Sequence, residues 1–528
     1  MTQPRASIAP YEEIPLATTL HRTAARVPDK LAIIDGERQV TFRELDEQSN
    51  RFGNALGSIG IGKGDVVGVL SPNCIEFEVA FYGIAKAGAI VSTINSGYRE
   101  REVANQLDSS AATTLVVHRS LLELGQNAAA GAPDLKRLIV IDEDSRDPDS
   151  FWGLVERGSP TPPNIAINPK EDVVALPYSS GTTGLSKGVM LTHYNLTSTG
   201  RHMFDRPGEG AAPRADDAFL VHLPLFHIFG INVMMSIPVT LGATQVMMGR
   251  FDMDLFLRLL AEHRISTLFT VPPIALGLTQ HPDIGKYDLS ALRFAFVGGA
   301  PLSGELQGHL SDALGTTVLQ GYGLTEGPLI NIDYIEADRM RPGSVGPRVA
   351  DTELKVVDVE DAAREMPPGE AGELVVRGSQ VMKGYFNNLQ ATAETITEDG
   401  WMQTGDIVSI DDDGYMWVMD RKKELIKYKG FQVPPAELEG LLQEHPDLSD
   451  AAVIGKQDVA AGEIPKAFVV VKKGATVSAE DVMGFIAGQV ATFKQVREVE
   501  FVDEIPKTPS GKILRRVLAD RERSRSGT

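Results

Sequence analysis

The sequence has almost no cysteine, no long uninterrupted apolar run and fewer basic than acidic residues. Its one cysteine, Cys74, cannot form an intrachain disulfide, which is typical of a protein from a reducing compartment. Cys74 lies in SPNCIEF with no nucleophile motif around it, so we expect a buried structural thiol.

The most apolar stretch, IFGINVMMSIPVTLGA, begins at Ile228 and is interrupted by Gly230, Asn232, Ser236 and Pro238. It falls short of a transmembrane helix. The first residues, MTQPRASIAPYEEIPL, lack the apolar core of a signal peptide, and the last, RERSRSGT, match neither a prenylation nor a peroxisomal signal. We therefore expect no membrane span and a cytoplasmic location.

The shortage of basic residues limits the partners of the protein. Lys and Arg total 51 against 71 Asp and Glu, which gives a formal net charge of -20. A sequence-independent nucleic-acid binder needs a basic surface, so this class is disfavoured. A small anion can still be bound, because a few cations and backbone amides suffice. Whether the protein is a monomer or a homodimer stays open.

What the sequence does contain is the composition of a globular protein, with 42% hydrophobic and 23% charged residues over 528 positions. Short β-branched runs alternate with helical patterns, and several runs are apolar throughout, as in parallel strands covered on both faces. We expect strands at 66–70, 114–117, 138–141, 173–176, 219–221, 268–271 and 294–297, and helices at 76–86 and 256–263. The pattern predicts an α/β fold with more than one sheet.

The pattern changes near Gly343, after which short strands and turns follow. Beyond Arg421 the pattern is α+β, with a basic tail. We expect a large N-terminal domain of stacked α/β sheets (1–420), with a β-rich subdomain at about 343–420, and a small C-terminal domain (421–528). The expected elements are strands at 373–377, 415–419 and 466–471 and helices at 435–443 and 479–490.

A phosphate-binding loop is the strongest single signal. The stretch 178–193 reads YSSGTTGLSKGVMLTH and follows a predicted strand. Glycines let a backbone turn sharply and aim N–H groups at an anion, hydroxyls add neutral donors, and a lysine adds charge. The residues of this kind are Ser179, Ser180, Gly181, Thr182, Thr183, Gly184, Lys187 and Gly188. The spacing differs from that of a P-loop, which needs G-x-x-x-x-G-K-[ST], so a kinase or P-loop ATPase is disfavoured.

This loop resembles the signature loop of the acyl-adenylate-forming superfamily, which includes acyl-CoA synthetases and 4-coumarate–CoA ligases. Four further motifs resemble those of the family and follow in the same order: GYGLTE at 321–326, TGD at 404–406, DRKKELIKYKGFQ at 420–432 and PSGKILR at 509–515. The resemblance implies a two-step ATP-dependent ligase. A carboxylate attacks the α-phosphate of ATP to form an acyl-adenylate and pyrophosphate, and a thiol, usually coenzyme A, then displaces AMP.

The resemblance also implies the catalytic residues. Lys512 would bridge the substrate carboxylate and the α-phosphate, as a mobile charge on a long stem. Thr325 would contact phosphate, and Glu326 would hold Mg²⁺. His227, in PLFHIFGIN, would be an aromatic gate near the acyl carbonyl. A purely structural histidine, buried in the core with its hydrogen bonds made there, is equally expected.

Other residues are implied to bind the nucleotide or the thiol. Tyr322 would stack on adenine, flanked by Gly321 and Gly323, and Asp406 and Arg421 would bind the ribose. The remaining expectations are backbone contacts to adenine from Gly299, Ala300 and Pro301, phosphate contacts after adenylation from Lys427 and Gln432, a hinge at Lys423, and a pantetheine tunnel at Lys429 and Gly430. Because Lys512 must leave before the thiol enters, the C-terminal domain is expected to rotate.

The acyl group is less sharply defined by the sequence. Ser186 stands where most members have proline, and TEGPLI is one residue shorter than the plant ligases' stretch. Phe229 stands where the plant ligases often have a tyrosine that meets the 4-hydroxyl group, so strict 4-coumarate selection is not expected. We expect a hydrophobic aryl or medium-chain acid in a pocket lined by Ile228, Phe229, Val233, Gly298, Gly321, Gly323, Pro328 and Leu329.

Alternatives remain open at this point. The chain could load an acyl carrier protein in trans or act on long-chain fatty acids. Two less favoured hypotheses are a luciferase-like oxygenase and a nucleotide sensor. A sensor would have no need of Lys512. An α-amino acid substrate is disfavoured because the segment around His227 lacks the acidic residue that would hold the ammonium group.

Overall fold

The computed structural model describes residues 5–179, 186–206, 212–334, 336, 338–429, 431–458, 461–508 and 511–526. Its first sheet has eight strands, and its middle strands are parallel. In spatial order they are β18 (Gly384–Tyr385), β9 (Lys187–Thr192), β7 (Val173–Ala175), β4 (Ile90–Ile94), β3 (Val66–Leu70), β5 (Thr114–His118) and β6 (Arg137–Ile141), with β8 (Tyr178–Ser179) on β9.

The second sheet also has eight strands, and antiparallel strands stand at both of its edges. In spatial order they are β15 (Asn331–Ile332), β14 (Val318–Tyr322), β13 (Phe294–Val297), β12 (Thr267–Thr270), β10 (Ala218–Val221), β11 (Thr244–Met247), β1 (Leu31–Asp35) and β2 (Arg38–Thr41).

Helices cover both faces of these two sheets. Successive strand residues point to opposite faces, so a strand that is apolar throughout needs packing partners on both sides. On β3, Val67 and Val69 join the large core between the sheets, whereas Val66 and Leu70 join a core with α4 (Glu100–Ser109) and α5 (Leu122–Ala129). The inner core contains α1 (Leu16–Arg26), α2 (Phe42–Ser58), α3 (Ile75–Lys86), α6 (Phe151–Arg157), α7 (His193–Phe204), the π-helix η2 (Gly230–Ser236) and α8 (Ile237–Leu241).

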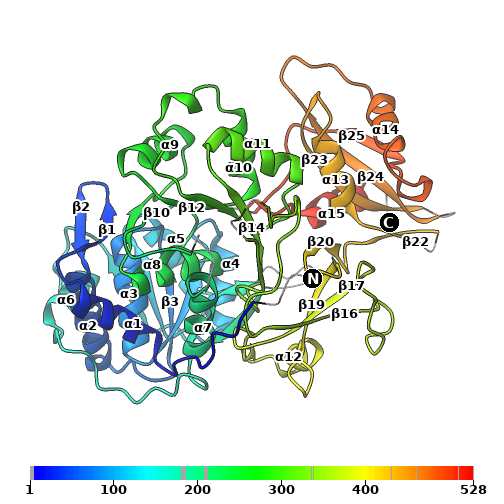
Figure 1. Ribbon diagram of the computed structural model, residues 1–528. Helices are drawn as coiled ribbons and strands as arrows, with labels where there is room; N and C mark the ends of the chain where they lie inside the picture. Colours follow the sequence, from blue (N-terminus) through cyan, green and yellow to red (C-terminus); the bar gives the residue numbers. More distant parts are fainter. Residues whose placement is uncertain are drawn as a thin grey trace.

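The outer face of the second sheet packs on α9 (Met253–Glu262), α10 (Pro272–Gln280) and α11 (Gly304–Leu314). Short 3₁₀ helices are η1 (Arg119–Leu121), η3 (Ile284–Lys286) and η4 (Thr492–Lys494). The alternation of helix, sheet, helix, sheet and helix confirms the predicted stacked α/β architecture, which Figure 1 shows at left and centre.

Two smaller antiparallel or mixed sheets complete the molecule. The third sheet contains, in spatial order, β16 (Glu353–Val357), β17 (Ala371–Arg377), β19 (Met402–Ile410) and β20 (Met416–Arg421). The helix α12 (Leu389–Thr395) lies below this sheet in Figure 1. The fourth contains β22 (Phe431–Val433), β21 (Ile426–Tyr428), β24 (Gly462–Val471), β23 (Leu448–Asp458) and β25 (Glu498–Phe501). It packs with α13 (Pro435–Gln443), α14 (Ala479–Ala487) and α15 (Arg515–Ser526).

The predicted fold class, a large domain of sheets and helices with a β-rich part and a smaller α+β C-terminal domain, is therefore confirmed. One detail differs from the expectation: β18 lies within the predicted β-rich stretch but pairs with β9 of the first sheet. The boundary between residues 420 and 421, and the mobility of the second part, stay predictions.

Candidate active site

A cavity of about 1030 Å³ opens where the parallel strands of the second sheet end. Ligands bind in open α/β sheets outside these carboxyl ends. His227 follows β10, Gly298 follows β13 and Tyr322 ends β14, while Lys187 comes from the first sheet and Lys512 from the turn before α15. The cavity wall thus joins residues that lie far apart in the chain, from Ser109 to Lys512.

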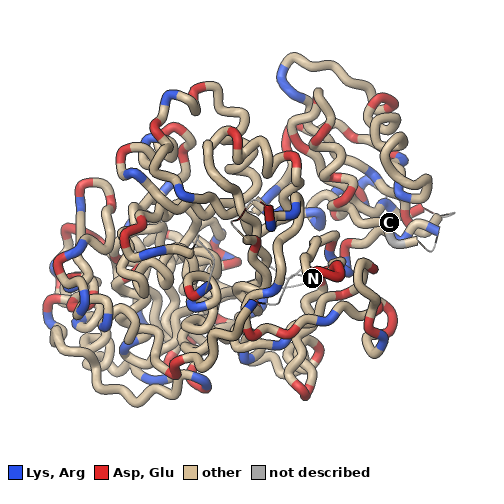
Figure 2. Tube along the Cα trace, in the orientation of Figure 1, with Lys and Arg blue, Asp and Glu red and all other residues tan. Residues whose placement is uncertain are grey.

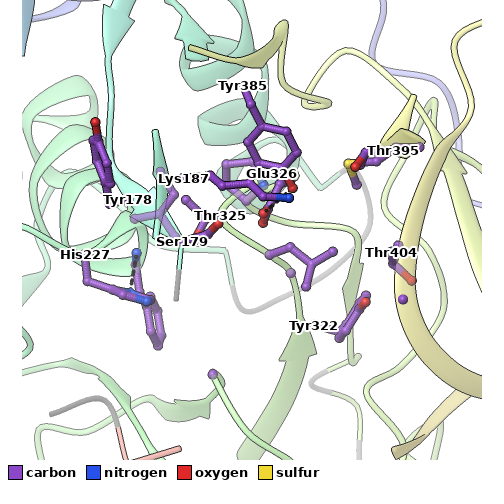
Figure 3. A pocket seen from close by; sticks show the side chains of 18 of the residues that line it. Tyr178, Ser179, Lys187, His227, Tyr322, Thr325, Glu326, Tyr385, Thr395 and Thr404 are labelled. Carbon is purple, nitrogen blue, oxygen red and sulfur yellow. Dashed lines mark hydrogen bonds between the residues drawn. The ribbon is translucent and has the colours of Figure 1, made fainter. Parts of the chain in front are cut away.

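The turn after β14 is shaped by two glycines that stand against other atoms. A Cβ on Gly321 would lie 2.3 Å from Cζ of Phe296, and one on Gly323 would lie 2.3 Å from the carbonyl oxygen of Pro328. No side chain fits at either position. The turn thereby brings Thr325 and Glu326 into the cavity wall, where Figure 3 shows them side by side.

Lys187 begins β9 and points into the cavity, with its ammonium 4.7 Å from the ring centroid of Tyr385. Among the residues that the structure describes, no acid pairs with Lys187. The hydroxyl of Tyr385 donates a hydrogen bond of 2.9 Å to Oε1 of Glu326. Burial and the charge of Glu326 raise the pKa of Tyr385, so its hydroxyl remains a donor.

Asp406, predicted to bind ribose, is buried opposite Arg421 in the β19–β20 pair. Its Oδ1 lies 2.6 Å from Nε of Arg421, and its Oδ2 accepts the hydroxyl of Tyr322. Burial raises the pKa of Asp406, and the charge of Arg421 opposes that rise. The hydrogen bond to Asp406 anchors the Tyr322 ring, which is the predicted platform for adenine.

Lys512 lines the same cavity, in a turn closed by a hydrogen bond from the backbone N–H of Gly511 to the carbonyl oxygen of Thr508. Burial and the nearby positive charge of Arg421 lower the pKa of Lys512. Gly511 has φ +83°, and a Cβ there would lie 2.3 Å from Cγ of Pro273 on α10. The turn that carries Lys512 is therefore seated directly on the second sheet's helical layer.

His227 stands at the opposite end of the cavity from the ribose residues (Figure 3). Its Nδ1 accepts the backbone N–H of Phe229 at 3.2 Å. Burial lowers the pKa of His227 to about 4, so the ring is neutral at pH 7. Beside it, Phe229 meets Phe296 edge to face, with ring centroids 6.1 Å apart.

The end of the cavity near His227, where we expect the acyl group, is mostly apolar, but it contains one buried amide. Neither the Oδ1 nor the Nδ2 atom of Asn232 has a hydrogen-bond partner within the described part of the chain, and the residue is 1% exposed. Asn232 lies on η2, and a π-turn often marks a functional site. Leaving both polar atoms unpaired costs stability unless a ligand or water meets them.

The structure does not bring every predicted residue to the cavity. Those at its wall are Ser179, Lys187, Gly188, His227, Ile228, Phe229, Val233, Gly298, Gly299, Gly321, Tyr322, Gly323, Thr325, Glu326, Pro328, Leu329, Arg421, Lys423 and Lys512, with Asp406 directly behind Tyr322. Ala300 and Pro301 are not among the wall residues, and Lys427 and Lys429 are exposed on the β21–β22 hairpin. Ser180, Gly181, Thr182, Thr183, Gly184 and Gly430, and the side chain of Gln432, lie outside the described residues.

Among the wall residues that the sequence interpretation did not identify, Tyr385 and Asn232 matter most for the chemistry of the site. Tyr385 stands in the short segment GYFNN, which carries no charged or nucleophilic group that would attract attention. Asn232 was counted only as an interruption of an apolar run. A lone polar residue in such a run was the signal that could have identified it.

The strand β9 also was not anticipated. We expected a strand before the loop, but strands stand on both sides of it, because β8 and β9 pair antiparallel with Ser179 opposite Lys187. Lys187 is consequently a strand residue whose direction is set by the sheet.

The donor set fits Mg²⁺ held jointly with phosphates. No cluster of three or more His, Cys, Asp or Glu that could cage a metal occurs in the described residues. Mg²⁺ is usually bound through one or two carboxylates together with substrate phosphates and water. Glu326 at the cavity wall, next to the Thr325 hydroxyl, matches that pattern.

Outside the cavity, basic and acidic residues are interspersed over the described chain (Figure 2).

Comparison with known proteins agrees with this site. The AMP-binding enzyme family matches residues 20–386, and its C-terminal domain family matches residues 437–512. The chain belongs to the AMP-binding enzyme family. The predicted superfamily of adenylate-forming enzymes and the predicted class, an AMP-forming acid–thiol ligase, are thereby confirmed.

Relatives along nearly the whole chain are CoA ligases. The 4-coumarate–CoA ligase of Pinus taeda is 39% identical over 97% of this chain and 95% of its own length. The anthranilate CoA ligase AuaEII, solved with anthranoyl-AMP, superposes with a TM-score of 0.89 at 28% identity, covering 99% of both chains. ATP-bound MatB from Rhodopseudomonas palustris superposes with a TM-score of 0.87 at 29% identity, covering 96% of this chain and 98% of that one.

The described helices include none that is both long enough and apolar enough to cross a membrane.

Proposed function

We propose that this AMP-forming ligase joins a hydrophobic aryl or medium-chain carboxylic acid to coenzyme A through an acyl-adenylate. The observation that carries the proposal is the single cavity in which cationic and nucleotide-type residues meet an apolar end lined by Phe229, Val233 and Leu329. A cavity of about 1030 Å³ is large enough to hold a nucleotide together with a compact acid.

In the first step, a carboxylate oxygen of the acid bonds to the α-phosphorus of ATP, and the bond to pyrophosphate breaks. Both reactants are anions, so positioning and charge neutralisation supply most of the catalysis. Lys187 would hold the outgoing phosphates and Lys512 would lie between the carboxylate and the α-phosphate. Tyr322, Asp406 and Arg421 would hold the adenosine.

Glu326, with Thr325 beside it, would hold Mg²⁺ at the phosphates. When bound, Mg²⁺ neutralises charge on the phosphate oxygens. The neutral His227 ring would stand near the acyl carbonyl, where a charged imidazolium would instead pair with the carboxylate.

In the second step, the thiol sulfur bonds to the acyl carbon, the bond to AMP breaks and the thiol proton is lost. Lys512 occupies the cavity wall, so the thiol needs another arrangement of the C-terminal part. We propose rotation about Lys423, which would bring Lys427, Lys429, Gly430 and Gln432 from the β21–β22 hairpin to the site. Lys427 and Lys429 are not among the cavity-wall residues in the present arrangement.

The aryl assignment is supported by Phe229 and Phe296, whose rings form one side of the acyl end. It is also supported by relatives named for 4-coumarate and anthranilate. Phe229 has no hydroxyl for a 4-hydroxy ring, so the proposal is a broader acid range than 4-hydroxycinnamates. A panel of aryl and aliphatic acids tests it, and turnover of 4-hydroxycinnamates alone would contradict it.

Release of pyrophosphate from Lys512→Ala tests the catalytic assignment. We expect a loss of at least about a hundredfold in release, since removing one preorganised charge aimed at a transition state costs this much. Thiolysis of preformed acyl-adenylate by coenzyme A should be retained. Unchanged pyrophosphate release in Lys512→Ala would rule out the proposed role, and a thioester formed only with a carrier protein would favour loading in trans.

A further inference from the structure

Tyr385 contacts two groups that the proposed function uses separately. Its hydroxyl donates to Oε1 of Glu326 at 2.9 Å, and its ring faces the Lys187 ammonium at 4.7 Å. Tyr385 is 7% exposed and lies at the cavity wall, with its ring beside the ends of both Lys187 and Glu326 (Figure 3). A cation over an aromatic face is stabilised without any acid.

The backbone holds Tyr385 in this place from several sides. Tyr385 pairs with Val189 across β18 and β9, so Lys187, two residues from Val189, presents its side chain to the same face. The N–H of Phe386 donates to the carbonyl of Gly188 at 2.9 Å. The N–H of Met382 donates to the carbonyl of Glu326 at 2.9 Å. The segment around β18 therefore ties the phosphate-loop strand directly to the turn that carries Glu326.

The contacts of Tyr385 take the place of a direct ion pair between Lys187 and Glu326. Lys187 and Glu326 have opposite charges and line one cavity, and a direct ion pair between them would have to break before phosphate and Mg²⁺ could bind. The ring of Tyr385 makes a cation–π contact with the Lys187 ammonium. Its hydroxyl donates a hydrogen bond to Oε1 of Glu326. Both charged groups are thus kept in position for ligands.

We propose that Tyr385 is a positioning residue that sets the Glu326 carboxylate for Mg²⁺ through its hydroxyl and the Lys187 ammonium for phosphate through its ring. This inference rests on the proposed function, because it takes Glu326 as the metal ligand and Lys187 as a phosphate ligand.

The two contacts can be separated by two substitutions. Tyr385→Phe removes the hydroxyl and keeps the ring, whereas Tyr385→Leu removes both. Tyr178→Phe is the matched control, because Tyr178 lines the same cavity but its hydroxyl meets neutral groups, among them the Ser109 hydroxyl at 2.8 Å and the Gln106 carbonyl oxygen.

The readout is equilibrium binding of α,β-methylene-ATP by calorimetry, titrated with Mg²⁺ and repeated with Mg²⁺ removed by chelation. For Tyr385→Phe we expect half-maximal Mg²⁺ enhancement at about tenfold higher Mg²⁺, the effect of losing one hydrogen bond to a charged group, with unchanged binding when Mg²⁺ is absent. Tyr385→Leu should show the same shift and, in addition, weaker Mg²⁺-free binding. Thermal unfolding verifies that each variant is folded.

Glu326→Gln and Lys187→Met separate failure of this inference from failure of the proposed function. If Glu326→Gln shifts the Mg²⁺ requirement but Tyr385→Phe behaves like Tyr178→Phe, the positioning role of Tyr385 is wrong and the metal assignment stands. If Glu326→Gln itself changes nothing, the metal assignment is wrong and the role of Tyr385 falls with it. Mg²⁺-free binding that Lys187→Met weakens but Tyr385→Leu does not would overturn the ring's role.

Discussion

Asn232 is an amide enclosed by apolar side chains, and both of its polar atoms lack partners within the described residues. Such a group lowers the stability of the free protein, because its hydrogen bonds to water are lost on folding. It also gives the proposed acyl end of the cavity one point that can recognise a polar substituent. The same side chain thus lowers the stability of the free protein and provides a group that can select among acids.

Asn232→Leu should therefore stabilise the protein and alter its choice of acid. We expect the free energy of unfolding to rise by about 1–3 kcal/mol, the cost of a buried unpaired polar group. The ratio of kcat/KM for hydroxy- or amino-substituted aryl acids to that for unsubstituted ones should fall. Ser236→Ala is the control, since the Ser236 hydroxyl on the same π-helix already donates to the carbonyl of Ile231 at 2.7 Å. An unchanged acid ratio in Asn232→Leu would exclude Asn232 from selection.

Between elements, α3 and β11 meet through ionisable and polar groups in the inner core. Glu78 on α3 is fully buried and accepts from Nε2 of Gln245 on β11 at 3.3 Å. Burial raises the pKa of Glu78 from 4.5 to about 8. At neutral pH the folded protein therefore holds a proton at Glu78 that the unfolded chain has released.

This proton makes the stability of the α3–β11 contact depend on pH. Because the folded protein binds more protons than the unfolded chain between the two pKa values, the contribution is fully present below about pH 4.5, where both states are protonated, and is lost as the pH rises toward about 8. The slope approaches roughly 1.4 kcal/mol per pH unit for one proton. Glu78→Gln should remove this slope, as measured by the thermal midpoint at pH 5 to 8. The exposed Glu156→Gln should keep it, and parallel curves for wild type and Glu78→Gln would show that Glu78 does not hold the proton.

At the scale of the whole molecule, the turn carrying Lys512 docks on the large domain through Gly511. A side chain there would collide with Pro273, and φ +83° is itself unfavourable for any L-residue. The docked arrangement is thus compatible with glycine alone at this position.

Gly511→Ala should selectively disfavour the docked arrangement. The left-handed conformation alone costs about 1–2 kcal/mol, and the collision with Pro273 adds to it, so pyrophosphate release should fall at least about tenfold. Thiolysis of preformed acyl-adenylate should change little. Adding Pro273→Ala removes the collision but not the backbone strain and should restore part of the release. Equal loss in both half-reactions would instead indicate a general folding defect.

Much of the fold was predictable because its information is local. The runs at 66–70 and 294–297 correspond residue for residue to β3 and β13, since short apolar runs of this length are typical of strands buried on both faces. The helix at 435–443 matches α13. The short β8, β9 and β18 were not predicted, because strands of two to six residues in a glycine-rich stretch have no periodicity to detect.

The sequence by itself determined the reaction class, because the phosphate loop, the Thr325-Glu326 turn and the Lys512 motif each place their groups within a few consecutive residues. It also determined that the anion is bound by local groups, since the net charge of -20 provides no general attraction. Only the tertiary structure decided that Tyr385 contacts both Lys187 and Glu326, that Asp406 anchors Tyr322, and that Gly511 rests on Pro273. These contacts join segments far apart in the chain, and their geometry follows from how sheets and turns pack.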